Sequence, residues 1–235
     1  MKKIMLGKKA IVLVFSNHIR EIAFLDDIGS SDTFKVTSQG LGDLMLKLSH
    51  DEYVDIFILP LTIIMGKEYM KIKETALIYQ GQFNNLKVGK SLLKDQSDQK
   101  CMIDVMKKIS FDKKKEQGVV WVGHGSQKSY GETYKSLSKL IEVSLEREIL
   151  ITLDDIFDLK DCLSKVKSWN VDEVIIRPFF LFAGNHYLNE VVSDSVFSLK
   201  SKLTGLGYNI HVSYKGLLSY NGVVEMFKEK ILQEE

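Results

Sequence analysis

The sequence predicts an α/β protein of two halves, each with a parallel sheet, related by pseudo-twofold symmetry and separated by a cleft. Continuous apolar segments, typical of strands buried on both faces, alternate with segments of helical, 3.6-residue periodicity. The same order of segments occurs twice in the 235 residues. We therefore expect an N-terminal α/β half over residues 1–109 and a C-terminal half over 110–235, whose last helix could pack on the N-terminal half.

An internal repeat supports this division. The segment that begins at Asp55 can be laid over the segment that begins at Glu173, at a constant offset of 118 residues. Pro60 then coincides with Pro178, and these are the two prolines of the chain. Because proline removes a hydrogen bond from a strand's ladder, we expect an irregularity or bend at both positions, directing the following segment into the cleft.

The repeat extends toward the start of each half. Residues 10–16 lie over residues 118–124, and the helix-like residues 41–48 lie over residues 161–167. Each half is therefore expected to run strand, helix, short strand, helix, strand, helix.

The composition disfavours several classes of partner. The chain has 32 basic and 31 acidic residues, a net charge of +1, so it has no long-range field to attract nucleic acid or an anionic membrane. The lysine run at residues 113–115 is expected to be a solvated turn. No apolar segment is long enough to cross a bilayer. The apolar residues 10–15 lack a following cleavage site, which indicates a first strand in a cytoplasmic protein rather than a signal peptide.

The two cysteines indicate a reducing compartment. Cys101 and Cys162 lie in amphipathic, helix-like segments and have no metal-ligand spacing. We therefore expect two buried thiols.

Two histidines follow predicted strands of the C-terminal half. His124 ends the buried segment Val119–Val122 and has a glycine on either side, whereas His186 follows the third strand of that half. Ligands of open parallel sheets bind outside the carboxyl ends of strands, so both histidines are expected on one rim. Structural alternatives stay open: His124 could cap a helix that begins near Ser126, and His186 could be a surface residue at a helix start.

An acidic pair could complete a metal site. Residues 150–155 are expected to form the second strand of this half and end in Asp154 and Asp155. One of these carboxylates could point at the two imidazoles, a ligand set that suits a divalent first-row metal with open positions. The alternative is that the aspartates cap a helix that starts near Phe157.

Together, Val122–Gly125, the strand that ends in an acid, and Pro178–His186 resemble the anaerobic sirohydrochlorin cobaltochelatases. These are class II tetrapyrrole chelatases of cobalamin biosynthesis. The resemblance covers most of the chain, including Pro60–Tyr69 and Gly216–Gly222. It implies two Rossmann-like halves around a porphyrin-sized cleft.

The resemblance also implies site residues and their roles. His124 and His186 would bind the incoming Co²⁺, and one of them would accept the pyrrole protons. The family has a glutamate as its third metal-site residue, and the aligned Asp154 is one methylene shorter. We therefore expect His124 as base and metal ligand, His186 as second ligand, and Asp154 as an orienting or weakly ligating group. The expected partners of the substrate carboxylates are backbone N–H groups around Ser16, Asn17 and Ser126.

The implied reaction is the insertion of Co²⁺, a substrate metal, into a sirohydrochlorin-like tetrapyrrole. The reaction would need no organic cofactor, nucleic acid or membrane. The apolar helix at residues 223–232 could form the interface of a homo-oligomer. Insertion of iron to give sirohaem stays open, because such ligand sets accept several divalent metals. A non-catalytic tetrapyrrole- or haem-binding protein also stays open. Phe15–His18 stands where the family has Ser-Phe-Gly-Thr, and the helix expected between Ile19 and Phe34 is short.

Overall fold

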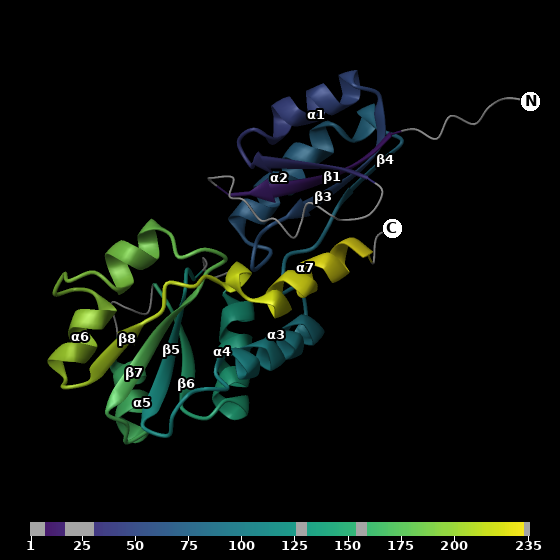
Figure 1. Ribbon diagram of the computed structural model, residues 1–235. Coiled ribbons are helices and arrows are strands. Elements are labelled where there is room, and N and C mark those ends of the chain that lie inside the picture. Colours follow the sequence, from purple (N-terminus) through teal and green to yellow (C-terminus); the bar gives the residue numbers. More distant parts are fainter. Residues whose placement is uncertain (1–7, 17–30, 126–130, 154–158, 233–235) are drawn as a thin grey trace, which may run out of the picture. The chain divides into compact units, whose positions relative to one another are not determined.

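The computed structural model describes residues 8–16, 31–125, 131–153 and 159–232 (Figure 1). Two four-stranded sheets, in which each described strand pair is parallel, are flanked by helices. The predicted α/β fold class is confirmed. No helix within these ranges is both long enough and apolar enough to span a membrane.

The chain divides into two compact units. One unit comprises the chain up to Lys94 together with the segment from Val224 onward, and the other comprises Asp95–Val223. The boundary expected from the sequence lies after residue 109 instead, with the last helix of the C-terminal half able to pack on the N-terminal half. Where independently folding domains begin and end stays a prediction.

The first unit holds a sheet of strand order β2-β1-β3-β4. Its elements are β1 (Lys8–Phe15), β2 (Asp32–Thr37), α1 (Leu41–His50), β3 (Tyr53–Pro60), α2 (Lys67–Ile78), the 3₁₀ turn η2 (Gln80–Gln82) and β4 (Asn85–Val88). β1 is buried from Ala10 onward, as expected for a strand that is covered on both faces. Helices α1 and α2 share one hydrophobic cluster with the sheet, through residues such as Met45 and Ile72.

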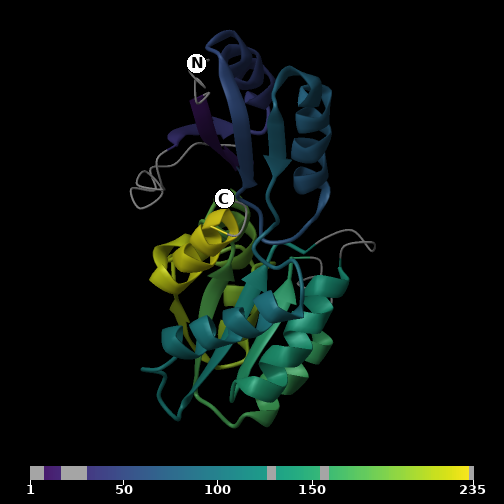
Figure 2. The same cartoon turned by 90° about the vertical axis from the view of Figure 1, so that its right-hand side faces the viewer.

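The second unit holds a sheet of order β6-β5-β7-β8. Its elements are α3 (Gln96–Ile109), β5 (Gln117–Gly123), α4 (Glu132–Ser144), β6 (Glu148–Thr152), α5 (Lys160–Ser168), β7 (Glu173–Phe179), the π-helical turn η4 (Tyr187–Val191), α6 (Leu199–Gly205), β8 (Asn209–Val212) and the 3₁₀ turn η5 (Leu217–Ser219). Helices α3 and α4 lie on one face of this sheet, and α5 and α6 lie on the other (Figures 1 and 2). The chain then enters α7 (Asn221–Leu232), most of which belongs to the first unit.

Strand pairing reproduces the sequence repeat. Val14 of β1 lies opposite Pro60 of β3, and Val122 of β5 lies opposite Pro178 of β7. These are the positions that the repeat superposes. The register reaches Pro60 at the end of β3 and continues past Pro178 to Phe179, with no shift at either proline. A predicted irregularity of pairing is therefore wrong, and a bend at these positions stays a prediction. Each proline lies within the last two residues of its strand, where the ladder is about to end.

Each sheet contains a fourth strand that the predicted plan lacks. β4 and β8 are four residues long, and their residues alternate between exposed and half-buried. Their pairing with β3 and β7 is parallel. Strands so short and half-exposed carry little hydrophobic signal, since continuous burial on both faces is what marks a parallel strand in a sequence.

Two glycines shape the end of β5. A Cβ atom on Gly123 would lie 2.7 Å from Cε1 of Tyr134, whose ring is buried beneath the strand. Gly125 has φ of +84°, a left-handed conformation that other residues adopt only with strain. The residue between them, His124, is exposed. The glycines therefore let a buried strand pack on an aromatic ring and turn sharply just past an exposed imidazole.

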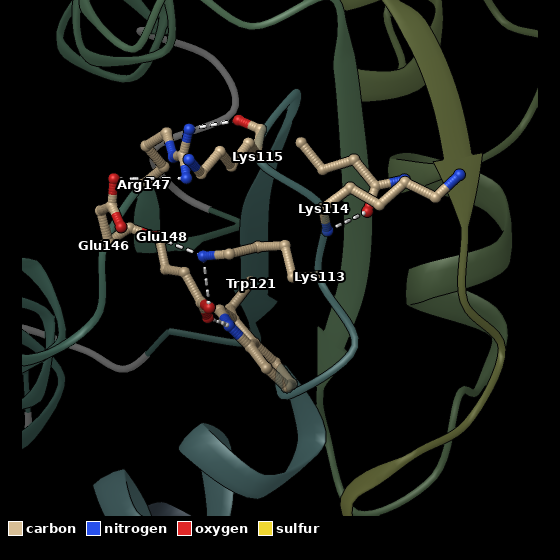
Figure 3. Close-up of polar contacts among 8 residues, drawn as sticks. Lys113, Lys114, Lys115, Trp121, Glu146, Arg147 and Glu148 are labelled. Atoms are coloured by element: carbon tan, nitrogen blue, oxygen red, sulfur yellow. Dashed lines mark hydrogen bonds and ion pairs between the residues drawn. The ribbon is translucent and has the colours of Figure 1, made fainter.

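A buried carboxylate ties together the other end of the second sheet (Figure 3). Glu148, the first residue of β6, is 3% exposed. Lys113 Nζ lies 2.9 Å from its Oε1, and Trp121 Nε1 donates to its Oε2 at 2.8 Å. Lys113 also donates to the carbonyl oxygen of Glu146. The carboxylate thus has a cation and an N–H donor, which a buried charge requires.

The structure corrects two expectations about single side chains. The Lys113 side chain is only 10% exposed, so this residue of the lysine run is not simply solvated. Cys162 is buried as predicted, but Cys101 is exposed. Its neighbours Met102 and Ile103 are buried, which leaves Cys101 on the solvent side of α3.

Replacing Lys113 with Met should destabilise the second unit by about 3 kcal/mol, because Glu148 would keep a buried charge without its cation. Urea unfolding followed by tryptophan fluorescence measures this, since both tryptophans, Trp121 and Trp169, lie in the second unit. The matched control is Lys135→Met, which breaks an exposed pair with Glu132 and should change stability by less than about 0.5 kcal/mol. Equal effects of the two variants would contradict this account.

Replacing Gly123 with Ala should cost roughly 1–3 kcal/mol of unfolding free energy, since the new methyl group would press on the buried Tyr134 ring. Gly205→Ala is the matched control, because nothing lies within 4 Å of its added Cβ. Thermal unfolding of both variants gives the comparison. An unchanged midpoint for Gly123→Ala would show that the ring gives way without cost.

Candidate metal centre

The structure brings His124 and His186 together. His124 directly follows β5, and His186 directly precedes the turn η4 after β7. β5 and β7 are parallel neighbours, so their carboxyl ends meet at one edge of the sheet. The two imidazole ring centres lie 5.2 Å apart, with an angle of 75° between the ring planes. Both side chains are exposed, so a ligand could reach them.

The alternative role of His124 as a helix cap does not fit α4. That helix begins at Glu132, and its N-cap position is Gly131. Ser126, where the capped helix was expected to begin, lies outside the described residues.

Aromatic packing supports the segment that carries His186. The Phe180 ring centre lies 6.2 Å from that of His124 and 6.1 Å from that of Tyr187. The Tyr187 hydroxyl lies 3.1 Å from the carbonyl oxygen of Ile176 and 2.7 Å from that of Ser213. Burial raises the pKa of Tyr187, so the phenol stays a donor. Tyr187 thus fastens the turn η4 to β7 and to the residue after β8.

Glu190 is a residue of this site that was not predicted from the sequence. Its Oε1 lies 2.5 Å from Nδ1 of His186. The two residues are four apart at the start of a helical turn, a spacing that places side chains side by side. This spacing was readable in the sequence and is the signal that could have identified Glu190.

The separation of the two imidazoles suits a shared metal ion. With a metal–nitrogen bond of about 2.1 Å, a ring centre lies about 3.2 Å from the ion, so two rings sharing it lie roughly 4.5–6.4 Å apart for ligand angles between about 90° and 180°. The observed 5.2 Å falls within that range. Within the described ranges, however, no three His, Cys, Asp or Glu side chains gather so as to hold a metal ion. The side chains described therefore offer a two-imidazole arrangement with open positions.

The remaining predicted site residues divide into two groups. Ser16 lies in the first unit directly after β1 and is exposed, and its carbonyl oxygen accepts a hydrogen bond of 3.0 Å from Oγ of Ser38. The others lie outside the described residues: Asn17, Ser126, Asp154 and Asp155. Their roles stay predictions.

Residues 25–234 match the model of the cobalt chelatase (CbiK) family. The sirohydrochlorin cobaltochelatase of Salmonella typhimurium is 24% identical over 161 residues, which cover 68% of this chain and 61% of the relative. Sirohydrochlorin cobaltochelatase CbiKC of Nitratidesulfovibrio vulgaris is 22% identical over 188 residues, covering 79% of this chain and 67% of the relative. The match to the Salmonella protein thus spans less than two thirds of its length.

Two solved structures have a similar fold. SirB from Bacillus subtilis with Fe³⁺ has a TM-score of 0.65 at 16% identity, covering 96% of this chain and 95% of SirB. CbiX, described as the terminal enzyme of sirohaem biosynthesis in denitrifying bacteria, has a TM-score of 0.59 at 12% identity. The alignment covers 97% of this chain and 99% of CbiX. At these identities the likeness concerns the fold.

Because the family match extends over most of its residues, this chain belongs to the cobalt chelatase (CbiK) family.

Proposed function

We propose that this chain inserts Co²⁺ into sirohydrochlorin as a metal-inserting lyase of anaerobic cobalamin biosynthesis, in the cytoplasm. Family membership and the names of two relatives support this proposal. The observation that carries it is the pair of exposed imidazoles, His124 and His186, with ring centres 5.2 Å apart at the carboxyl edge of a parallel sheet. Such edges are where open α/β sheets bind ligands.

Insertion exchanges two pyrrole protons for one Co²⁺, giving the cobalt macrocycle and two free protons. A neutral imidazole has one nitrogen lone pair, which can accept a proton or hold a metal ion near neutral pH. His124 is the proposed base and metal ligand, and His186 is the second ligand. Few protein ligands leave open positions on the ion, so the macrocycle nitrogens can replace the protein and the product can leave.

Further groups complete the proposal. Asp154 follows Leu153, whose backbone N–H donates to the carbonyl oxygen of Gly123 at 3.0 Å. Leu153, the residue before Asp154, therefore lies beside Gly123, the residue before His124. This neighbourhood supports the proposed role of Asp154 as an orienting or weakly ligating carboxylate. Backbone N–H groups around Ser16, Asn17 and Ser126 are the proposed partners of the substrate carboxylates. Sirohydrochlorin and Co²⁺ are the only reactants that the proposed reaction requires.

The reaction is tested by mixing purified protein, metal-free sirohydrochlorin and Co²⁺ and following the absorption spectrum. The wild type should metallate many equivalents of macrocycle per protein. His124→Ala should slow insertion at least about 100-fold, the usual contribution of a proton acceptor. His211→Ala is the matched control, since its imidazole pairs with Glu173 at the first residue of β7, the opposite end of the strand, and its rate should stay within about twofold.

The same spectra distinguish the alternatives. A spectral change that stops at one macrocycle per protein would replace the chelatase with a non-catalytic binding protein. Faster turnover with Fe²⁺ than with Co²⁺ under anaerobic conditions would favour sirohaem formation. Undiminished turnover by His124→Ala, with the wild type active, would remove His124 from the mechanism while leaving the reaction in place.

A further inference from the structure

Glu190 has a single polar partner among the described residues, and that partner is a candidate metal ligand. Its Oε1 lies 2.5 Å from Nδ1 of His186, and no lysine or arginine described in the structure pairs with it. The carboxylate is about half exposed, at 45%, so it is not buried for the sake of packing. Its position is therefore best explained by what it does to the imidazole.

The local backbone holds the two side chains side by side. Tyr187 and Val191 are fully buried, and they are four residues apart, like His186 and Glu190. The turn between them is π-helical, with the backbone N–H of Val192 donating to the carbonyl oxygen of Tyr187 at 3.2 Å. Burial of Tyr187 and Val191 fixes which side of the turn faces the core. His186 and Glu190 therefore lie next to each other on the side that faces solvent.

A carboxylate beside one ring nitrogen selects the tautomer of a histidine. An ionised carboxylate only accepts hydrogen bonds, so a neutral His186 must carry its proton on Nδ1 in order to donate to Glu190. The lone pair then resides on Nε2. Nε2 has no hydrogen-bond partner among the described residues, so it is available to a metal ion. Such a contact also makes the imidazole a better ligand.

The two imidazoles differ in this respect. His124 makes no hydrogen bond to any described residue, and its ring contacts are with Phe180 and His186. No described residue therefore fixes the tautomer of His124 through a hydrogen bond, as suits a group that takes up and releases protons. The ring of His186 is restrained, as suits a group that only holds the metal.

Direct ligation by Glu190 does not fit the geometry. His124, His186 and Glu190 are all described, yet they do not form a group of three that could hold one metal ion. A carboxylate that touches the imidazole on its Nδ1 side acts through the ring.

We infer that Glu190 is a positioning residue: it holds His186 in the Nδ1–H tautomer with Nε2 free to bind Co²⁺. His186 then serves as a metal ligand only, and the proton-accepting role falls to the other ligand, His124. This inference rests on the proposed function, since it divides that reaction between the two histidines. Loss of a partner of this kind typically weakens metal binding or activity by about 10–100-fold.

The test compares Glu190→Ala with the matched control Asn189→Ala, a neighbouring exposed side chain of the same turn. Long-range ¹H–¹⁵N NMR of histidine-labelled, metal-free protein reports which nitrogen of His186 carries the proton. The wild type and Asn189→Ala should show Nδ1–H, and Glu190→Ala should shift to Nε2–H, the form preferred by free histidine. A merely structural role would not change this signature.

Kinetics supply the second measurement. Glu190→Ala should raise the KM for Co²⁺ about 10–100-fold and leave the KM for sirohydrochlorin unchanged, and Glu190→Asp, which keeps the carboxylate, should recover part of the loss. The same His186 tautomer in Glu190→Ala and wild type, or an unchanged KM for Co²⁺, would overturn the inference. A tautomer change in a protein whose wild type inserts no metal would refute the proposed function but not the contact between Glu190 and His186.

Discussion

The parallel pairing of β5 with β7 is the constraint on which the candidate metal centre depends. Val122 lies opposite Pro178 and Gly123 opposite Phe179, so β5 ends just before His124 at the level where β7 ends and the chain continues toward His186. A slip of one residue would move one strand end by about 3.3 Å and reverse which side chains face each helix layer. A strand register between residues more than 50 positions apart in the chain therefore sets the 5.2 Å separation of the imidazoles.

The two ends of this sheet are fastened to their surroundings by different means. Lys113, Glu148 and Trp121 form a buried charged network at the start of β6, and the Arg177 guanidinium lies 5.6 Å from the Trp121 ring centre. At the carboxyl edge, Tyr187 ties the histidine-bearing turn to the sheet. One end is thus fixed by charge within a closed interior. The other is fixed by the buried ring of Tyr187, whose neighbours His186 and Glu190 stay exposed, an arrangement that fits the proposed exchange of a metal ion.

Sequence reasoning succeeded where local patterns determine the structure. The apolar segments at Ala10–Phe15 and Val119–Val122 are buried strands. Because the carboxyl ends of parallel strands meet at one edge of a sheet, the sequence also placed His124 and His186 on the same edge. It failed where tertiary surroundings decide. The burial of Lys113 depends on Glu148, 35 residues away, and no pattern around residue 113 contains that information. Glu190 is a different case: its spacing of four residues from His186 was readable in the sequence, and the structure adds the contact between the two side chains.

The central claim is that the imidazoles of His124 and His186 bind one Co²⁺ together. X-ray absorption spectroscopy at the cobalt edge tests this claim most directly. With protein in excess over Co²⁺ and no macrocycle, the outer-shell scattering should fit two imidazoles in the wild type and one in each of His124→Ala and His186→Ala. A spectrum that does not change when either histidine is removed would mean that the metal binds elsewhere, and the account would be contradicted.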